Sequence, residues 1–207
     1  MIKSIAFMPR RPDLGRAAFR TYYETRHAPL ALKHFRFARY VRNHLSDAQQ
    51  PGFDCLSEFW HGDMEHTRSL MAGDVGAIMH ADEDNFIDRA STRAALAEAY
   101  LLSGPERIFE AGTAKTVLLL GATTGANRDM LLASAQQAFS GTEARVTLDL
   151  LSPFDTRPLP HDALLTFWSS DDADFAPPPG WSVSGRINVV AEETPAADLA
   201  RAGQPAV

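Results

Sequence analysis

The feature that most constrains this chain is the order of its short apolar segments, which is strand, helix, strand, strand, helix over the first 80 residues. Residues 3–8 are apolar and β-compatible, and the Arg-Arg-Pro sequence after them ends the strand because proline cannot continue a central ladder. Asp13 is a suitable N-cap for a helix that we expect to end before Pro29. Alternation of polarity over 37–45 and 53–61 predicts two more strands.

Two helices are expected after these strands. Asp63 can cap a short helix that runs to about residue 71, where the glycines of the Ala-Gly-Asp-Val-Gly sequence end it. Residues 82–103 begin with a possible cap, Asp82, and are rich in alanine, the residue with the highest helix propensity. We therefore predict a second helix over this segment.

A similar order of segments begins again after Gly112. Residues 115–120 and 164–168 predict buried strands, and Asn127 is a suitable N-cap for the helix between them. The prolines of the segment 171–180 exclude a second helix there, because proline breaks a helix interior. We interpret the second half as a degenerate copy of the first.

These patterns divide the chain into a first α+β unit at 1–110, a second and degenerate unit at 111–191, and a flexible tail at 192–207 that is rich in Ala and Pro. A four-stranded antiparallel sheet with helices on one face needs a cover on its other face. The cover is expected to be a second sheet, supplied by the same chain or by another subunit in a homodimer. The functional site is predicted to lie in the cavity between the two sheets.

Composition limits the possible partners. The formal net charge of −6 argues against nucleic acid, which is bound by basic surfaces. No apolar run approaches the roughly 20 residues that a membrane helix needs, so we expect no membrane partner and a cytoplasmic location. The single cysteine, Cys55, lies in an apolar strand and is expected to be a small buried residue.

Several short motifs occur in a specific order across residues 1–103. They are Arg-His-Ala-Pro-Leu at 26–30, Tyr-Val-Arg-Asn-His at 40–44, Glu58 with Trp60, and Asp-Glu at 82–83 with Phe86 four residues after the aspartate. This set resembles the EthD domain family of the dimeric α+β barrel group. The resemblance implies a ferredoxin-like fold, a dimeric α+β barrel, with two tandem ferredoxin-like halves in this chain.

The resemblance also implies a small cavity enzyme that works without metal, flavin or haem. The first hypothesis is a cofactor-independent lyase, either a dehydratase or a cyclase, that acts on a hydrophobic carbonyl compound of aromatic or polyketide type. The alternative is a cofactor-free monooxygenase that forms quinones, in which a base makes a phenolate and the substrate itself reduces oxygen. A second alternative is a non-catalytic protein that binds small molecules. Fold does not decide among them.

Histidines are the first candidates for proton transfer. His27 lies near a predicted helix end, where the helix dipole favours the protonated form, and the resemblance favours a catalytic role. His44 shares a strand face with Tyr40 and Arg42, so a base, a phenol donor and a permanent cation would converge if that face lines the cavity. If the opposite face lines it, Arg39 and Asn43 replace them.

Glu58 completes the predicted catalytic set. It lies in an apolar strand, where a carboxylate either pairs with a cation or has a raised pKa. Trp60 and Tyr23 are predicted to line a pocket for a planar substrate, with Asp54 as a weaker binding candidate. The histidine spacings do not predict a metal site, and the glycine spacings match neither a phosphate-binding loop nor a dinucleotide site.

Overall fold

Segments of alternating polarity form the strands of the structure, a computed structural model that describes residues 1–46, 49–168 and 175–202. Successive side chains of a strand point to opposite faces, so alternating polarity places polar residues on one face and apolar residues on the other. The strands are β1 (Ile2–Met8), β2 (Phe37–Leu45), β3 (Cys55–His61), β4 (Arg93–Ser103), β5 (Ala111–Ala122), β6 (Val146–Pro153), β7 (Ala163–Phe167) and β8 (Trp181–Glu193).

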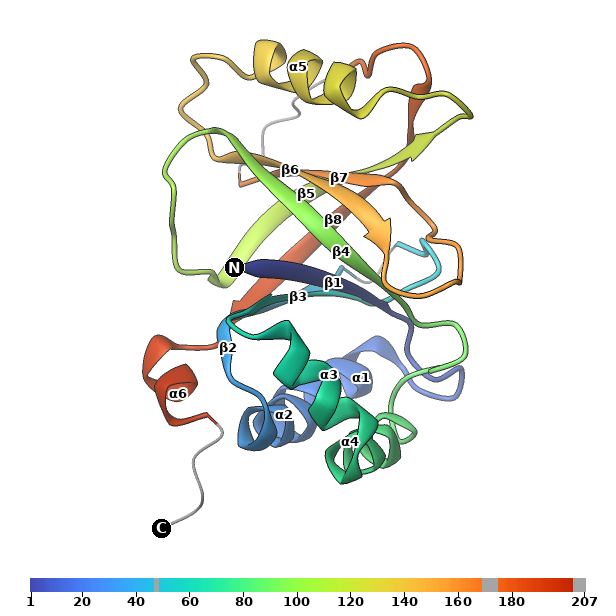
Figure 1. Ribbon diagram of the computed structural model, residues 1–207, viewed down its shortest axis with the longest axis vertical. Coiled ribbons are helices and arrows are strands. Elements are labelled where there is room, and N and C mark those ends of the chain that lie inside the picture. The colour runs from blue at the N-terminus through green and yellow to red at the C-terminus, as the bar shows by residue number, and fades with distance from the viewer. Residues whose placement is uncertain (47–48, 169–174, 203–207) are drawn as a thin grey trace.

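All eight strands pair antiparallel and close into one barrel in the order β1-β3-β2-β8-β5-β7-β6-β4 (Figure 1). Two of these pairings join the first half of the chain to the second. Val41 to Leu45 of β2 pair with Val189 to Glu193 of β8, and β4 pairs with β6 along most of its length. Closure leaves no strand edge exposed along the barrel wall.

The predicted fold class, a ferredoxin-like dimeric α+β barrel with two tandem halves, is wrong. The structure is instead a closed eight-stranded antiparallel barrel with few helices, formed within a single chain. The physical reason lies in the sheet edges. The prediction placed two separate sheets face to face, whereas the β2–β8 and β4–β6 hydrogen bonds join all strands edge to edge.

The helices pack on opposite sides of the barrel. Figure 1 shows α1 to α4 together on one side of the strands and α5 alone on the other. The bounds are α1 (Arg16–Tyr22), η1 (Tyr23–His27), α2 (Ala28–His34), α3 (Met64–Ala72), α4 (Asp74–Glu83), α5 (Arg128–Ala138) and α6 (Ala196–Arg201). Asp63 caps α3 and Asn127 caps α5 through their side-chain oxygens, which confirms these two predicted caps. The predicted cap Asp13 is wrong, because Gly15 is the N-cap residue of α1.

The first helix does not end before Pro29 as predicted. A π-helical turn, η1, links α1 to α2, and the Ala28 N–H donates to the carbonyl oxygen of Tyr23. Pro29 then occupies the first turn of α2, where a missing N–H costs little. The turn places His27 at the junction of two helices, and π-helical turns are frequent at functional sites.

The predicted helix over 82–103 is also wrong. Asp82 lies in the last turn of α4, and residues 93–103 form β4 between β1 and β6. Pairing on both sides overrides the helix propensity of the alanines, because propensity is a weak determinant beside tertiary contacts.

Three apolar clusters pack this fold. One fills the barrel interior, one lies under α1 to α4, and one lies under α5. The interior cluster includes Phe7, Leu56 and Leu119, each at most 2% exposed. Side chains therefore fill the barrel interior, the space in which the site is predicted to lie.

The end of the chain leaves β8 at Glu193 and forms α6, whose Leu199 packs against the cluster under α1 to α4. The predicted flexible tail at 192–207 includes residues 203–207, and the proline-rich segment 171–180 includes 171–174. Both of these parts lie outside the described residues. Among the helices that the structure describes, none has the length and apolar character needed to span a membrane.

Candidate functional site

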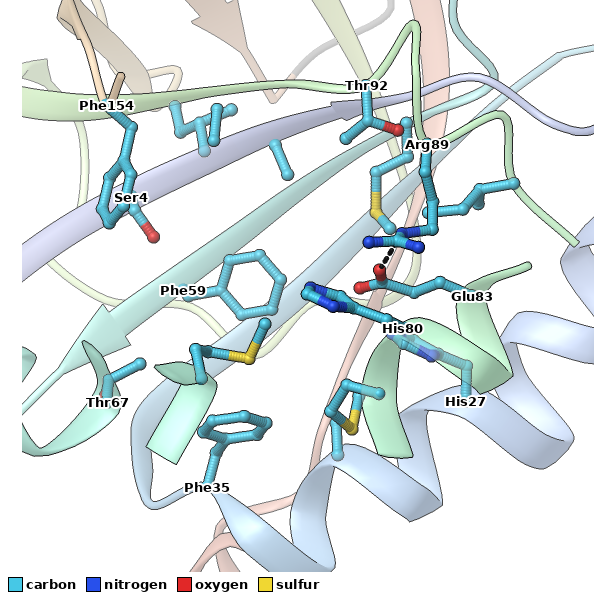
Figure 2. A pocket seen from close by; sticks show the side chains of 18 of the residues that line it. Ser4, His27, Phe35, Phe59, Thr67, His80, Glu83, Arg89, Thr92 and Phe154 are labelled. Carbon is cyan, nitrogen blue, oxygen red and sulfur yellow. Dashed lines mark ion pairs between the residues drawn. The ribbon is translucent and has the colours of Figure 1, made fainter. Parts of the chain in front are cut away.

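A cavity of about 380 Å³ lies between the outer face of the barrel wall and the helices of the first half. Its wall on the strand side comes from β1, β2, β3 and β4, and its other walls come from η1, α2, α3 and α4 (Figure 2). Phe154 and Arg157, from the loop between β6 and β7, reach its mouth, so the second half contributes to the same pocket. The volume is in the range of small-molecule sites.

The middle of the pocket is apolar and aromatic. Phe35, Phe37 and Phe59 contribute rings, with the Phe35 and Phe37 rings stacked at 5.7 Å between centroids. Four thioether side chains complete this part of the lining, those of Met8, Met64, Met71 and Met79. Aromatic faces and flexible, polarisable methionines suit a planar hydrophobic ligand.

His27 lines the pocket and is held by a carboxylate. Its Nδ1 lies 2.8 Å from Oδ2 of Asp82, and the Tyr22 hydroxyl donates to Oδ1 of the same carboxylate at 3.0 Å. Burial lowers the pKa of His27, although Asp82 opposes this shift, so the ring is neutral at neutral pH. Since a carboxylate only accepts, Nδ1 carries the proton and Nε2 is left as the acceptor.

Glu83 lies beside His27 in the same wall, with His80 and Arg89 (Figure 2). Burial raises the pKa of Glu83 to about 7, although the Arg89 guanidinium at 3.2 Å opposes that shift. A carboxyl group with this pKa exchanges protons near neutral pH, which suits a group that passes protons between a pocket and solvent.

The other end of the pocket holds a second polar group. Nε2 of His61 lies 2.8 Å from the Ser4 hydroxyl, and Nδ1 lies 3.4 Å from the Thr67 hydroxyl. Burial lowers the pKa of His61 to about 4, so this ring is also neutral at neutral pH. Figure 2 shows Ser4 and Thr67 on one side of the pocket and His27, Glu83 and Arg89 on the other.

Of the residues predicted from sequence, His27 is the one that lines this pocket. His44 and Arg42 instead bind Glu24, whose carboxylate lies 2.6 Å from Nε2 of His44 and 2.8 Å from the Arg42 guanidinium. Burial lowers the pKa of His44, but Cys55 and Glu24 outweigh burial and raise it to about 9. A ring that is protonated at neutral pH and paired in this way is not placed to act as a base.

Tyr40 and Tyr23 are fully buried in the core under the helices. The Tyr40 hydroxyl donates to the Tyr23 hydroxyl at 3.1 Å, and the latter lies 2.7 Å from the Ser57 hydroxyl. Asp54 forms ion pairs with Arg10 and Arg16 beside a smaller cavity. These side chains support the fold around the pocket without lining it.

Glu58 points into the barrel rather than into the pocket. Its carboxylate pairs with Lys3 at 2.7 Å and accepts from the Asn43 amide at 2.6 Å. Burial raises its pKa, but Lys3 and Lys115 outweigh burial and hold the pKa well below its usual range. Trp60 lies next to this cluster, with the Lys3 ammonium 4.8 Å from its ring centroid.

Glu83 and His61 were missed by the sequence reasoning, although signals for both were present. Glu83 belongs to the Asp-Glu pair at 82–83 that carries part of the family resemblance. His61 follows Trp60 and therefore lies on the opposite face of β3, the face that meets the helices. Both were overlooked because the pocket was expected on the other face of the sheet.

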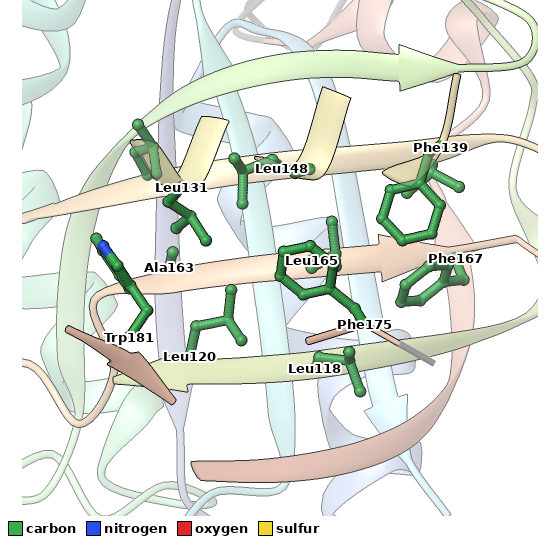
Figure 3. Packing of buried hydrophobic residues seen from close by; sticks show 13 residues of the cluster. Leu118, Leu120, Leu131, Phe139, Leu148, Ala163, Leu165, Phe167, Phe175 and Trp181 are labelled. Carbon is green, nitrogen blue, oxygen red and sulfur yellow. The ribbon is translucent and has the colours of Figure 1, made fainter. Parts of the chain in front are cut away.

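The equivalent space under α5 is filled (Figure 3). Leu131 and Phe139 at the α5 side pack against Leu148, Leu165 and Phe167 of β6 and β7. All five are at most 5% exposed. The second half therefore offers a packed core where the first half offers a pocket.

Within the part of the chain that the structure describes, no group of three His, Cys, Asp or Glu side chains is arranged to hold a metal ion. The pocket side chains supply acid–base groups and an apolar lining.

Residues 11–90 match the family model of the EthD domain, in agreement with the resemblance seen in the sequence. A comparison with curated proteins yields no match. Three solved structures share the fold of the whole chain, with sequence identities too low to show more than a fold.

A putative monooxygenase from Lactobacillus acidophilus NCFM aligns with 92% of this chain and 93% of its own, at 9% identity and a TM-score of 0.53. A putative monooxygenase from Fusobacterium nucleatum aligns over 92% and 91%, at 9% identity and a TM-score of 0.55. A putative chlorite dismutase aligns over 97% and 98%, at 7% identity and a TM-score of 0.54.

Proposed function

Since residues 11–90 match the EthD family model, we propose that the protein is a monooxygenase that oxidises a phenolic aromatic compound in the pocket between the barrel and α2, α3 and α4. The names of two solved structures with this fold support an oxygenase. Those names also overturn the lyase or cyclase that the sequence predicted as the first hypothesis. They fit the monooxygenase alternative better.

The observation that carries this proposal is the His27–Asp82 pair beside an apolar, aromatic pocket. Nε2 of neutral His27 accepts the phenol proton, and Asp82 stabilises the imidazolium that forms. Tyr22 fixes the other oxygen of Asp82, which holds the carboxylate in the orientation that keeps the Nδ1 proton on His27.

The reaction balances without an added reductant. The phenolate carbon opposite the oxygen attacks O₂ and forms a C–O bond, and the resulting peroxide takes up the proton held by His27. The hydrogen on that carbon then leaves as a proton, its electron pair forms the second carbonyl as the O–O bond breaks, and the outer oxygen leaves as hydroxide, which becomes water. A phenol with a hydrogen at that carbon thus becomes a quinone, with one oxygen atom in the product and one in water. The substrate supplies all four electrons. Phe35, Phe59 and the methionines exclude water from the phenolate, which strengthens its electrostatic contacts.

Oxygen uptake tests the proposal. Chelator-treated protein is mixed with naphthols and related phenols under ¹⁸O₂, and we expect oxygen consumption with one labelled atom in the quinone. His27→Gln is expected to lose roughly 100- to 10,000-fold in kcat/KM, the range for loss of a positioned base. Activity of the wild type is expected to fall as pH drops through the pKa of His27, because the protonated ring cannot accept the phenol proton.

His66→Gln is the matched control, because His66 is exposed on α3 and does not line the pocket. It should retain wild-type oxygen uptake. Ligand binding without oxygen uptake across the panel, or full activity in folded His27→Gln, would exclude the proposed oxygenase.

A further inference from the structure

The end of the pocket that holds His61 takes no part in the proposed proton transfer, yet it is a built polar site. His61 is the last residue of β3 and is 5% exposed, and the Ser4 hydroxyl on β1 contacts its ring. Thr67 approaches the same ring from α3. Three elements therefore place hydrogen-bonding side chains around one spot in an otherwise apolar wall.

The hydrogen-bond directions at this end can be followed from Thr67. Its hydroxyl donates to the carbonyl oxygen of Asp63 at 3.0 Å, so toward His61 it can only accept. The single proton of the neutral His61 ring then lies on Nδ1, and Nε2 accepts the Ser4 proton at 2.8 Å. The Ser4 oxygen has no proton left and presents lone pairs to the pocket that it lines.

The His27 end of the pocket also presents a hydrogen-bond acceptor. Its Nδ1 proton is given to Asp82, so Nε2 can only accept from a ligand. Both ends of the pocket thus accept hydrogen bonds, and the rings of Phe35 and Phe59 lie between them (Figure 2). A ligand that fits must donate at both ends across a flat apolar middle.

We propose that the substrate is a fused-ring aromatic diol with hydroxyl groups at opposite ends, and that Ser4, oriented by His61, determines this specificity. This inference rests on the proposed function, since His27 accepts the reacting phenol. An ether or carbonyl oxygen at the far end would face the Ser4 lone pairs without a hydrogen between them. A site built to accept from a hydroxyl rejects an analogue that lacks it, because the buried acceptor is left unpaired.

Binding under anaerobic conditions tests the specificity separately from turnover. The probes are a naphthalene diol with hydroxyl groups at its two ends, the corresponding naphthol and the monomethyl ether of the diol. Wild-type protein should bind the diol roughly 3- to 10-fold more tightly than the naphthol, the effect of one hydrogen bond, and the ether most weakly. Ser4→Ala should lose the preference for the diol over the naphthol.

Ser69→Ala, an exposed position on α3, is the matched control and should keep the preference for the diol. Equal binding of diol, naphthol and ether by the wild type would overturn the inference even if Ser4→Ala does not fold. A diol preference that depends on Ser4 without any oxygen uptake would support the specificity and exclude the oxygenase. Oxygen uptake without a preference for the diol would support the oxygenase and overturn the specificity.

Discussion

The raised pKa of the Glu83 carboxyl group makes the stability of the protein depend on pH. It lies in an apolar wall with its side chain 19% exposed, and burial raises its pKa to about 7. The folded protein therefore binds a proton that the unfolded chain releases near its ordinary pKa of 4.5. The stability linked to this proton is complete below that pH and is lost as pH rises through about 7.

Glu83→Gln is expected to unfold at a higher temperature than the wild type at about pH 8, because the neutral amide avoids a buried charge. The gain in free energy of unfolding should be about 2–3 kcal/mol at most and should disappear below the pKa of the unfolded chain. Thermal unfolding at several pH values measures it. Glu143→Gln, at an exposed position, serves as the control with no such pH dependence. A difference that is constant with pH would contradict the raised pKa.

Residue identity alone did not separate reactive groups from structural ones. His27, His44 and Glu58 were equally suitable for acid–base chemistry in the sequence. The difference lies in partners that are distant along the chain, because Asp82 leaves one nitrogen of His27 to accept, whereas Glu24 and Lys3 hold His44 and Glu58 as ions. No pattern within a strand or helix records these partners.

At the scale of elements, α3 and α4 form the wall that carries Met71, Met79 and Glu83. They approach so closely at Gly76 that a Cβ atom there would lie 1.9 Å from the carbonyl oxygen of Met71. This contact is with backbone, so a side chain cannot be accommodated by a rotamer change. The angle between the two helices, and with it the pocket wall, depends on this glycine.

Gly76→Ala is expected to lower the free energy of unfolding by about 1–3 kcal/mol, the usual cost of overpacking, and to weaken ligand binding because Met71 and Met79 shift. Gly62→Ala is the control, because its Cβ would meet nothing within 4 Å. Urea unfolding and the naphthol affinity measure the two effects. If Gly76→Ala is as stable as Gly62→Ala, the close contact between α3 and α4 does not determine the position of the pocket wall.

Elements with a strong local signal could be predicted from sequence, and elements set by their neighbours could not. Alternation predicted β2 with its bounds, and Asp63 and Asn127 predicted the starts of α3 and α5. The alanine-rich β4 was predicted as a helix, since only its pairing with β1 and β6 makes it a strand. That error hid the strand that closes the barrel.

The whole molecule repeats one arrangement in its two halves. Trp60 lies against both Lys3 and Arg39, and Trp168 lies against both Lys115 and Arg145, at 4.7 to 4.9 Å from cation to ring centroid. The two halves share this polar end of the barrel but differ outside it, where one has a pocket and the other a filled core. The proposed domain boundary at 110 and 111 falls immediately before β5.

Lys3 joins the halves, because its ammonium lies 2.8 Å from both carboxylate oxygens of Asp149 on β6. Lys3→Met leaves Asp149 buried without its cation, and we expect a loss of about 3–5 kcal/mol in the free energy of unfolding. The double variant with Asp149→Leu should recover most of that loss, since Glu58 keeps its contacts with Asn43 and Lys115.

Urea unfolding of the wild type, the single variants and the double variant measures this coupling. The exposed substitution Arg201→Met is the control and should change nothing measurable. Equal losses in the single and double variants would mean that closure of the barrel relies on strand pairing alone and not on this ion pair.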